Sequence, residues 1–337
     1  MTKLLVALLL VSSTPAWALP EATLPVAYFS VVRPWLTLRE RGGTFDGEGG
    51  VPIRYRTYRA TGFSRGTIVV SPGRGESMAK YDELVFDWLR AGGFDIYLMD
   101  HRGQGFSGRM LEDTQVGHVD SFDNYVKDFR EFMTDIVIPQ ARGKRFLLAH
   151  SMGGAIAAEY LRQYPDDFTA VALSAPMFEI NTAPYPETVA LSLAKVMIGL
   201  GKGSEYAFGQ KPFNPESSFE ENPLTSSRIR WELNQSFSRD LHPETALGGV
   251  SFRWVSESIQ ATRRVRQKAS ELKMPMILFQ SGQDRVVKPV GQTDVCSKAA
   301  QCRLIQTASA QHEVLMERDE LRGQAMTEIL DFFKSHL

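Results

Sequence analysis

A serine near the middle of the chain has the neighbours of an activated nucleophile. Ser151 lies in the run Ala149-His150-Ser151-Met152-Gly153-Gly154, after an apolar run typical of a buried strand and before a helical pattern. Small residues two positions before and two after the serine allow a sharp strand-to-helix turn that exposes the hydroxyl. This context predicts that Ser151 attacks a carbonyl carbon and forms a covalent intermediate.

A serine hydroxyl needs a base within hydrogen-bond reach and an acid that orients the base. His312 follows the last predicted strand after a short polar loop, so it is the predicted base. Asp284 lies in the loop after the strand predicted at 275–279 and is the predicted orienting acid. The alternative acids, Asp294 and Glu313, fall inside a predicted helix and directly beside the histidine.

Two backbone N–H groups are expected to bind the oxyanion that forms on the attacked carbonyl. One belongs to Met152, the residue after the nucleophile. The other belongs to Arg74, in the loop after the strand predicted at 67–70, because Pro72 has no N–H to donate.

Two further motifs are interpreted as structural. Ser64 also lies between two glycines, but its run precedes a predicted strand instead of following one, so we expect a turn. The run 103–108 has the glycine spacing of a dinucleotide-binding loop, but no helical pattern clearly opens there. We expect that run to shape the floor of the pocket.

The elements that must position these residues alternate along the chain. Apolar runs typical of strands are followed by segments with helical spacing, which predicts an α/β protein with a mostly parallel sheet and helices on both faces. Strands are predicted at 53–58, 67–70, 95–99, 145–148, 170–173, 275–279 and 304–305. Helices are predicted at 80–91, 122–137, 154–164, 291–300 and 321–333.

The alternation stops between about residues 178 and 255. This stretch is rich in proline, glycine and aromatic residues, and it contains one apolar helical pattern at 189–200. The simplest interpretation is one α/β domain, residues 19–337, interrupted by a mainly helical cap.

The first 18 residues have the pattern of a secretory signal peptide. Lys3 precedes an apolar run at 4–11, and Ala16 and Ala18 form a small-x-small cleavage site. The apolar run is shorter than the about 20 residues that a bilayer-spanning helix needs. We expect cleavage after Ala18, with an uncleaved anchor or a buried N-terminal helix as the alternative.

Composition limits the partners. The chain has 38 Lys and Arg residues against 39 Asp and Glu residues and no basic run, which argues against nucleic acid as the main partner. Two cysteines are too few for a Cys-rich zinc site. In an oxidising compartment Cys296 and Cys302 could form a disulfide, and the alternative is two buried small side chains.

These motifs resemble those of a known family. The runs at 100–105, 149–154, 282–287 and 312–317 resemble the monoacylglycerol lipase-like α/β-hydrolases, and Ser-Pro-Gly-Arg-Gly-Glu-Ser at 71–77 is similar to the lysophospholipase L2 branch. The resemblance implies an α/β-hydrolase fold that cleaves the acyl ester of lysophospholipids, with acyl transfer to another alcohol possible. It implies no metal and no organic cofactor. The alternatives are a monoacylglycerol lipase, a general carboxylesterase and a non-catalytic lipid-binding relative.

The resemblance also suggests where the substrate binds. The Arg74 side chain is a candidate to meet a phosphate head group, and a surface ion pair with Glu76 is the alternative. Apolar cap residues are expected to line an acyl-chain tunnel, to lie on a membrane surface, or simply to pack on the core: Val189, Leu193, Val196, Met197 and Leu200. Together with the signal peptide, this predicts a bacterial protein that is exported and periplasmic or peripherally membrane-associated.

Overall fold

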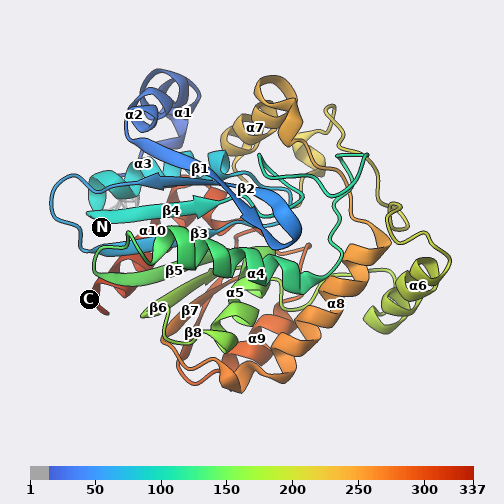
Figure 1. Cartoon of the computed structure of the whole chain (residues 1–337). Helices are drawn as coiled ribbons and strands as arrows, with labels where there is room; N and C mark the ends of the chain where they lie inside the picture. Colours follow the sequence, from blue (N-terminus) through green and yellow to red (C-terminus); the bar gives the residue numbers. More distant parts are fainter. Residues whose placement is uncertain (1–14) are drawn as a thin grey trace, which may run out of the picture.

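An eight-stranded sheet runs through the computed structural model, which describes residues 15–337 (Figure 1). The strand order is β1-β2-β4-β3-β5-β6-β7-β8, with β1 and β2 antiparallel to their neighbours and all other pairs parallel. The strands are β1 (Glu40–Gly47), β2 (Val51–Tyr58), β3 (Gly66–Ser71), β4 (Phe94–Met99), β5 (Lys144–His150), β6 (Ala170–Ser174), β7 (Met276–Ser281) and β8 (Cys302–Thr307). The mostly parallel sheet that the sequence predicts is confirmed.

Helices cover both faces of the sheet. They are α1 (Leu24–Ala27), α2 (Arg33–Thr37), α3 (Asp82–Ala91), α4 (Phe122–Glu131), α5 (Met152–Gln163), α6 (Glu187–Gly199), α7 (Arg228–Ser236), α8 (Phe252–Gln267), α9 (Pro289–Lys298) and α10 (Asp319–Lys334). One hydrophobic cluster joins the sheet to α4, α5, α8 and α9, and a second joins it to α1, α3 and α10.

The central strands show why the two clusters lie on opposite faces. In β3, Val69 belongs to the first cluster, whereas Ile68 and Val70 belong to the second, and all three side chains are fully buried. Successive side chains of a strand point to opposite faces, so a strand covered on both sides is apolar at every position.

The segment between β6 and β7 holds the region predicted as a cap. It contains α6 and α7, and α6 projects from the body of the molecule at the right of Figure 1. The helix α8 follows them and packs against α4, α5 and α9. The helix α8 was not predicted from the sequence, although Ser251 caps its start by accepting the N–H of Trp254. The division into one domain with a cap stays a prediction.

Two further predictions concern the N-terminal signal peptide and the two cysteines. Residues 1–14 of the predicted signal peptide lie outside the described residues. Within 15–337, no helix is both long and apolar enough to cross a membrane. A disulfide joins Cys296 of α9 to Cys302 of β8.

Candidate active site

Ser151 lies at the turn between β5 and α5, in a backbone conformation that few residues other than glycine adopt, with a φ of 49°. The turn is possible because glycines follow the serine. A Cβ atom on Gly153 would lie 2.3 Å from the carbonyl oxygen of Ser71, and one on Gly154 would lie 2.5 Å from the Cβ atom of Pro176. The chain therefore has the strained nucleophile turn that the sequence indicates.

The predicted base and acid lie beside this serine. The Nε2 atom of His312 lies 2.9 Å from the Ser151 Oγ atom, and its Nδ1 atom lies 2.8 Å from Asp284 Oδ2. The other carboxylate oxygen of Asp284 accepts the N–H groups of Val286 and Val287, at 2.8 and 3.0 Å. Burial raises the pKa of Asp284, but its hydrogen bond to His312 and these two N–H groups outweigh burial and hold the pKa below its ordinary value. The structure thus brings the three predicted residues together in the order that general-base activation needs.

The two alternative acids have other partners. Asp294 pairs with Lys298 at 2.7 Å on the surface of α9. Glu313 pairs with Lys80 at 2.5 Å. Neither carboxylate is hydrogen-bonded to His312, whereas Asp284 is, so the geometry favours Asp284 as the orienting acid.

The loop after β3 faces the nucleophile. Two side chains hold it at Gly73: the Glu76 carboxylate accepts the N–H of Gly73 at 2.6 Å, and the Gln104 amide donates to its carbonyl at 2.7 Å. Among residues 15–337, no acceptor takes the N–H of Arg74 or of Met152. Both predicted oxyanion donors are therefore free for a substrate oxygen.

The two motifs interpreted as structural have structural partners. The Ser64 hydroxyl donates to the carbonyl of Gly66 in the turn before β3. The run 103–108 does not line the cavity at Ser151, so the expectation that it shapes the pocket floor is wrong. The run lies behind the loop after β3, which Gln104 supports through hydrogen bonds. Other polar groups of the run form hydrogen bonds with one another and with neighbouring loops.

A buried ionic cluster beside the site was not predicted. Lys80 lies between Glu76 and Glu313, at 2.6 and 2.5 Å, and Tyr81 donates to Glu76 at 2.7 Å. His150 completes it, with its Nε2 atom 3.5 Å from Glu76 and its ring 5.0 Å from that of His312. Burial lowers the pKa of His150, which favours a neutral ring there. Only the i,i+4 spacing of Glu76 and Lys80 signals this cluster in the sequence.

Ser151 and His312 open into a cavity of about 480 Å³, which Arg74 also lines. A second cavity of about 510 Å³ adjoins it, and five residues form walls of both: Ile180, Asn181, Gln210, Val250 and Trp254. Apolar side chains dominate the second cavity, among them Tyr185, Leu193, Phe208, Phe252 and Val255. The two spaces together suit a long substrate with one polar and one apolar part.

The Arg74 side chain does not form the ion pair with Glu76 that was the alternative. Its guanidinium donates to the carbonyl of Gly248 at 3.0 Å and lies 5.7 Å from the ring centre of Trp254. No carboxylate within residues 15–337 forms an ion pair with Arg74, and burial lowers the pKa of its guanidinium. A partly buried cation without an anionic partner favours an anionic ligand.

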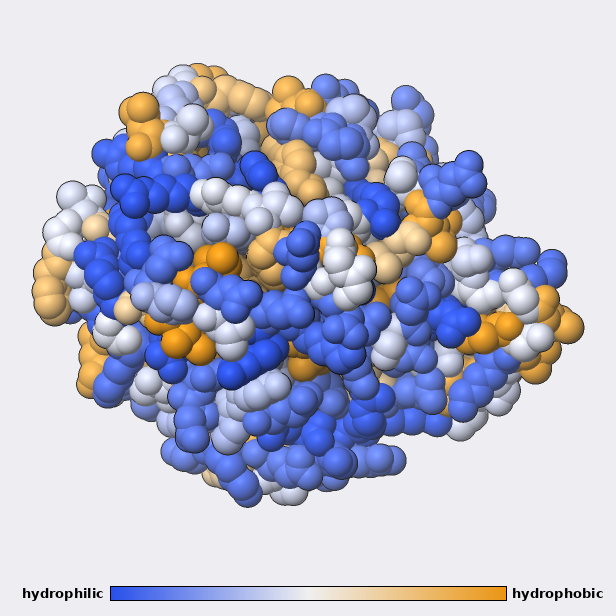
Figure 2. Space-filling view, viewed as in Figure 1, coloured by the Kyte–Doolittle hydropathy of each residue, from blue (hydrophilic) through white to orange (hydrophobic). Residues whose placement is uncertain are grey.

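The positions of the α6 side chains show that part of the substrate-site prediction is wrong. Of the four α6 side chains predicted to bind substrate, Leu193 lines the second cavity, while Val189 and Val196 are 41% and 58% exposed and Met197 packs against the core. None of these side chains lines the cavity at Ser151. The periodicity of α6 could not distinguish a lining face from an outer face, because apolar residues lie on both. Figure 2 shows hydrophobic residues exposed at the edge of the molecule that α6 forms.

Comparisons with known proteins agree with this geometry. The family model described as serine aminopeptidase, S33, matches residues 62–319. The chain is similar to lysophospholipase L2 of Escherichia coli strain K12, with 37% identity over 87% of both chains. It is also similar to the probable lysophospholipase L2 of Haemophilus influenzae, with 30% identity over 85% of this chain and 90% of that one.

Solved structures support the fold. A soluble variant of monoglyceride lipase from Saccharomyces cerevisiae superposes with a TM-score of 0.68 and 16% identity, over 88% of this chain and 97% of that one. At this identity the likeness concerns the fold alone, and it confirms the α/β-hydrolase fold. The chain therefore belongs to the lysophospholipase L2 branch of the monoacylglycerol lipase-like α/β-hydrolases and is an ester hydrolase.

Proposed function

We propose that the protein is a lysophospholipase, which hydrolyses the acyl ester of a lysophospholipid and releases a fatty acid. The serine relay supports ester hydrolysis, and the relatives named lysophospholipase L2 support the substrate class. The observation that carries the choice of a phospholipid is Arg74. Arg74 lines the cavity that contains Ser151, and its guanidinium forms no ion pair with a described carboxylate.

The proposed reaction has two steps. His312 takes the proton of Ser151 as the hydroxyl oxygen attacks the ester carbonyl, and Asp284 holds the imidazole and stabilises its charged form. The N–H groups of Arg74 and Met152 bind the oxyanion. His312 then gives the proton to the leaving glycerol oxygen, and a water molecule releases the fatty acid from the serine by the reverse sequence. Another alcohol could replace that water, which would give acyl transfer.

The cavities divide the substrate between them. The glycerol ester lies at Ser151, with the phosphate within reach of Arg74. The acyl chain extends past Val250 and Trp254 into the apolar second cavity. Removing that chain from water provides the main binding energy, at roughly 0.8 kcal/mol for each buried CH₂ group.

We also propose that the protein acts outside the cytoplasm, at a membrane surface. Residues 1–18 have the signal-peptide pattern. Exposed apolar side chains on α6 and directly after it would enter the interfacial layer of a bilayer, together with Phe208 of the second cavity: Val189, Val196 and Leu200. This contact would place the mouth of the second cavity against the lipid that supplies the substrate.

Purified protein tests the substrate class. We expect a higher kcat/KM for lysophosphatidylethanolamine than for monoolein or for a short-chain nitrophenyl ester. A preference for monoolein would favour a monoacylglycerol lipase. A preference for the short ester would favour a general carboxylesterase, and either result would contradict the proposal.

A further inference from the structure

The residue after the predicted cleavage site has a buried acidic partner. The backbone nitrogen of Leu19 donates to the Oδ1 atom of Asp87 at 3.1 Å, and Asp87, in α3, is fully buried. We propose that Asp87 is the binding site for the N-terminus that signal-peptide removal creates, with the α-ammonium group of Leu19 as its ligand. The proposal rests on the export that is part of the proposed function.

The covalent step is a hydrolysis. One water molecule adds across the Ala18–Leu19 peptide bond, Ala18 leaves with a carboxylate, and Leu19 gains an amine that takes up a proton. In the uncleaved chain the Leu19 nitrogen carries one hydrogen and no charge. After cleavage the same nitrogen carries three hydrogens and a positive charge, so a hydrogen bond from a neutral donor to the carboxylate becomes an ion pair.

The contacts around Leu19 hold its nitrogen at this place without the preceding residues. The Leu19 side chain packs against the hydrophobic cluster formed with α3 and α10. Two residues later, the N–H of Glu21 donates to Asp319 Oδ2 at 2.8 Å, and the Glu21 carboxylate accepts the hydroxyl of Ser227. Cleavage at Ala18 therefore leaves the anchors of the new terminus intact.

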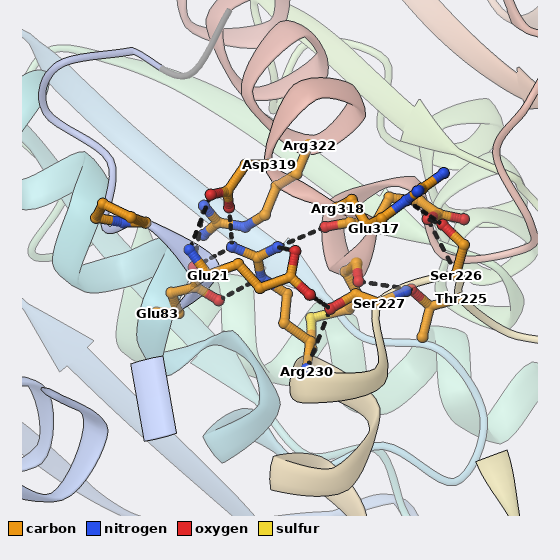
Figure 3. Close-up of polar contacts among 12 residues, drawn as sticks. Glu21, Glu83, Thr225, Ser226, Ser227, Arg230, Glu317, Arg318, Asp319 and Arg322 are labelled. Carbon is orange, nitrogen blue, oxygen red and sulfur yellow. Dashed lines mark hydrogen bonds and ion pairs between the residues drawn. The ribbon is translucent and has the colours of Figure 1, made fainter. Parts of the chain in front are cut away.

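The charged groups around Leu19 include more carboxylates than cations. Four carboxylates meet two guanidinium groups in this cluster, part of which Figure 3 shows: Glu21, Glu83, Asp87 and Asp319 against Arg230 and Arg322. An ammonium group on Leu19 would reduce the excess from two negative charges to one. Burial raises the pKa of Asp87 to about 6 although Arg322 opposes it, and Glu83 adds to the increase. A carboxylate in this condition gains from a further positive neighbour.

The same cluster connects the terminus to the active site. Arg230, on α7, has no exposed surface and pairs with Glu83 at 2.9 Å and with Asp319 at 2.7 Å (Figure 3). Asn234 and Gln235, one turn further along α7, line the cavity at Ser151. Removal of the signal peptide therefore strengthens the cluster that fastens this wall of the cavity to the core.

The first experiment measures the terminal amine itself. Protein exported with its full signal should have the mass of a chain that begins at Leu19. Its terminal amine, followed by NMR after labelling with ¹³C-methyl groups, should titrate above the ordinary range of about 7.7–8.0 for an α-amino group. Asp87→Asn should return the titration to that range. Asp82→Asn, which removes another buried carboxylate of α3 with different partners, should leave it raised.

Three results would overturn the proposal: a chain that begins at another residue, an ordinary titration of the Leu19 amine, or a raised titration that persists in Asp87→Asn. All three are independent of lipid hydrolysis. They are therefore distinguishable from a failure of the proposed enzyme function.

A second measurement needs no substitution and remains informative if Asp87→Asn does not fold. Pyridoxal phosphate converts the terminal amine to a carbonyl, which removes the charge and leaves every side chain in place. At pH 7 we expect the converted protein to melt at least about 2 °C lower than the untreated one. Because the folded amine has the raised pKa, this difference should be present at pH 7 and vanish as the pH rises through the folded value. Equal melting temperatures at pH 7 would contradict the proposal.

Discussion

The Nε2 atom of His312 lies 2.9 Å from the hydroxyl oxygen of Ser151, although 161 residues separate them in the sequence. The parallel sheet produces this contact, because Ser151 follows β5 and His312 follows β8 at the same edge. Asp284, after β7, reaches the same edge and holds the far side of the imidazole. The distances suit proton transfer from the serine to the histidine.

For catalysis, the negative charge of the Asp284 side chain should matter far more than its size. Asp284→Asn keeps the size of the side chain but loses the charge that orients and stabilises the imidazolium, so kcat should fall by about 10⁴-fold. The control is Asp294→Asn, which removes an exposed pair with Lys298 and should leave kcat unchanged. Turnover of a nitrophenyl ester measures both variants. A loss of less than tenfold in Asp284→Asn would remove Asp284 from the relay.

Arg74 is proposed to act through two groups, its backbone N–H and its guanidinium, and a substitution can separate their effects. Arg74→Ala keeps the backbone N–H for the oxyanion but removes the guanidinium of a residue that lines the cavity. We expect kcat/KM for lysophosphatidylethanolamine to fall at least tenfold, about 1.4 kcal/mol, and kcat/KM for monoolein to change little.

Arg74→Lys is the matched variant, because it keeps a positive charge without the planar fork. It should recover part of the activity on the phospholipid. Equal losses on both substrates in Arg74→Ala would show that the side chain acts on the ester chemistry and not on the phosphate.

Part of this site is predictable from sequence because it depends on local signals. The turn at Ser151 requires glycines at 153 and 154, and the acid and the base each follow a strand, so short runs were enough to find them. The same holds for the alternating elements of the core. The edge strand β1 and the helix α8 were not predicted, because β1 is half-exposed and rich in glycine and α8 carries many charged residues.

The remaining features depend on contacts between distant parts of the chain. Lys80 meets Glu313 and Arg230 meets Glu83 only after folding, and no spacing in the sequence indicates either pair. The direction of α6 is a similar case. Its apolar residues predict a helix, but the structure was needed to show that Leu193 faces a cavity while Val189 and Val196 face outward.

The outward face of α6 should bind lipid without taking part in the chemistry. Val189→Asp combined with Val196→Asp places two charges on exposed positions, so the fold should be retained and binding to vesicles of anionic phospholipid should fall several-fold. Turnover of a soluble nitrophenyl ester should stay the same. Leu38→Asp, at an exposed position near the N-terminal helices, is the control and should bind vesicles like the wild type. Unchanged vesicle binding in the double variant would exclude α6 as the membrane contact.

His101 should make stability depend on pH. Its ring is buried against the Ser71 hydroxyl at 3.0 Å, and burial lowers its pKa to about 4 from an ordinary value of 6.5. The unfolded chain therefore binds a proton that the folded chain does not. The free energy of unfolding should therefore decrease by up to about 3 kcal/mol as the pH falls from 6.5 towards 4.

Urea unfolding of the wild type and His101→Asn at several pH values measures this contribution. The difference in unfolding free energy between them should shrink as the pH falls. A His101→Asn curve that runs parallel to that of the wild type would contradict the assignment.

The most direct test of the account is the hydrolysis of lysophosphatidylethanolamine by the wild type and by Ser151→Ala. The wild type should release fatty acid and react with a fluorophosphonate probe. Ser151→Ala, with an unchanged melting temperature, should lose the probe reaction and at least about 10⁴-fold of the rate. Hydrolysis that persists in Ser151→Ala, or a wild type that labels but leaves the lysophospholipid intact, would contradict the account.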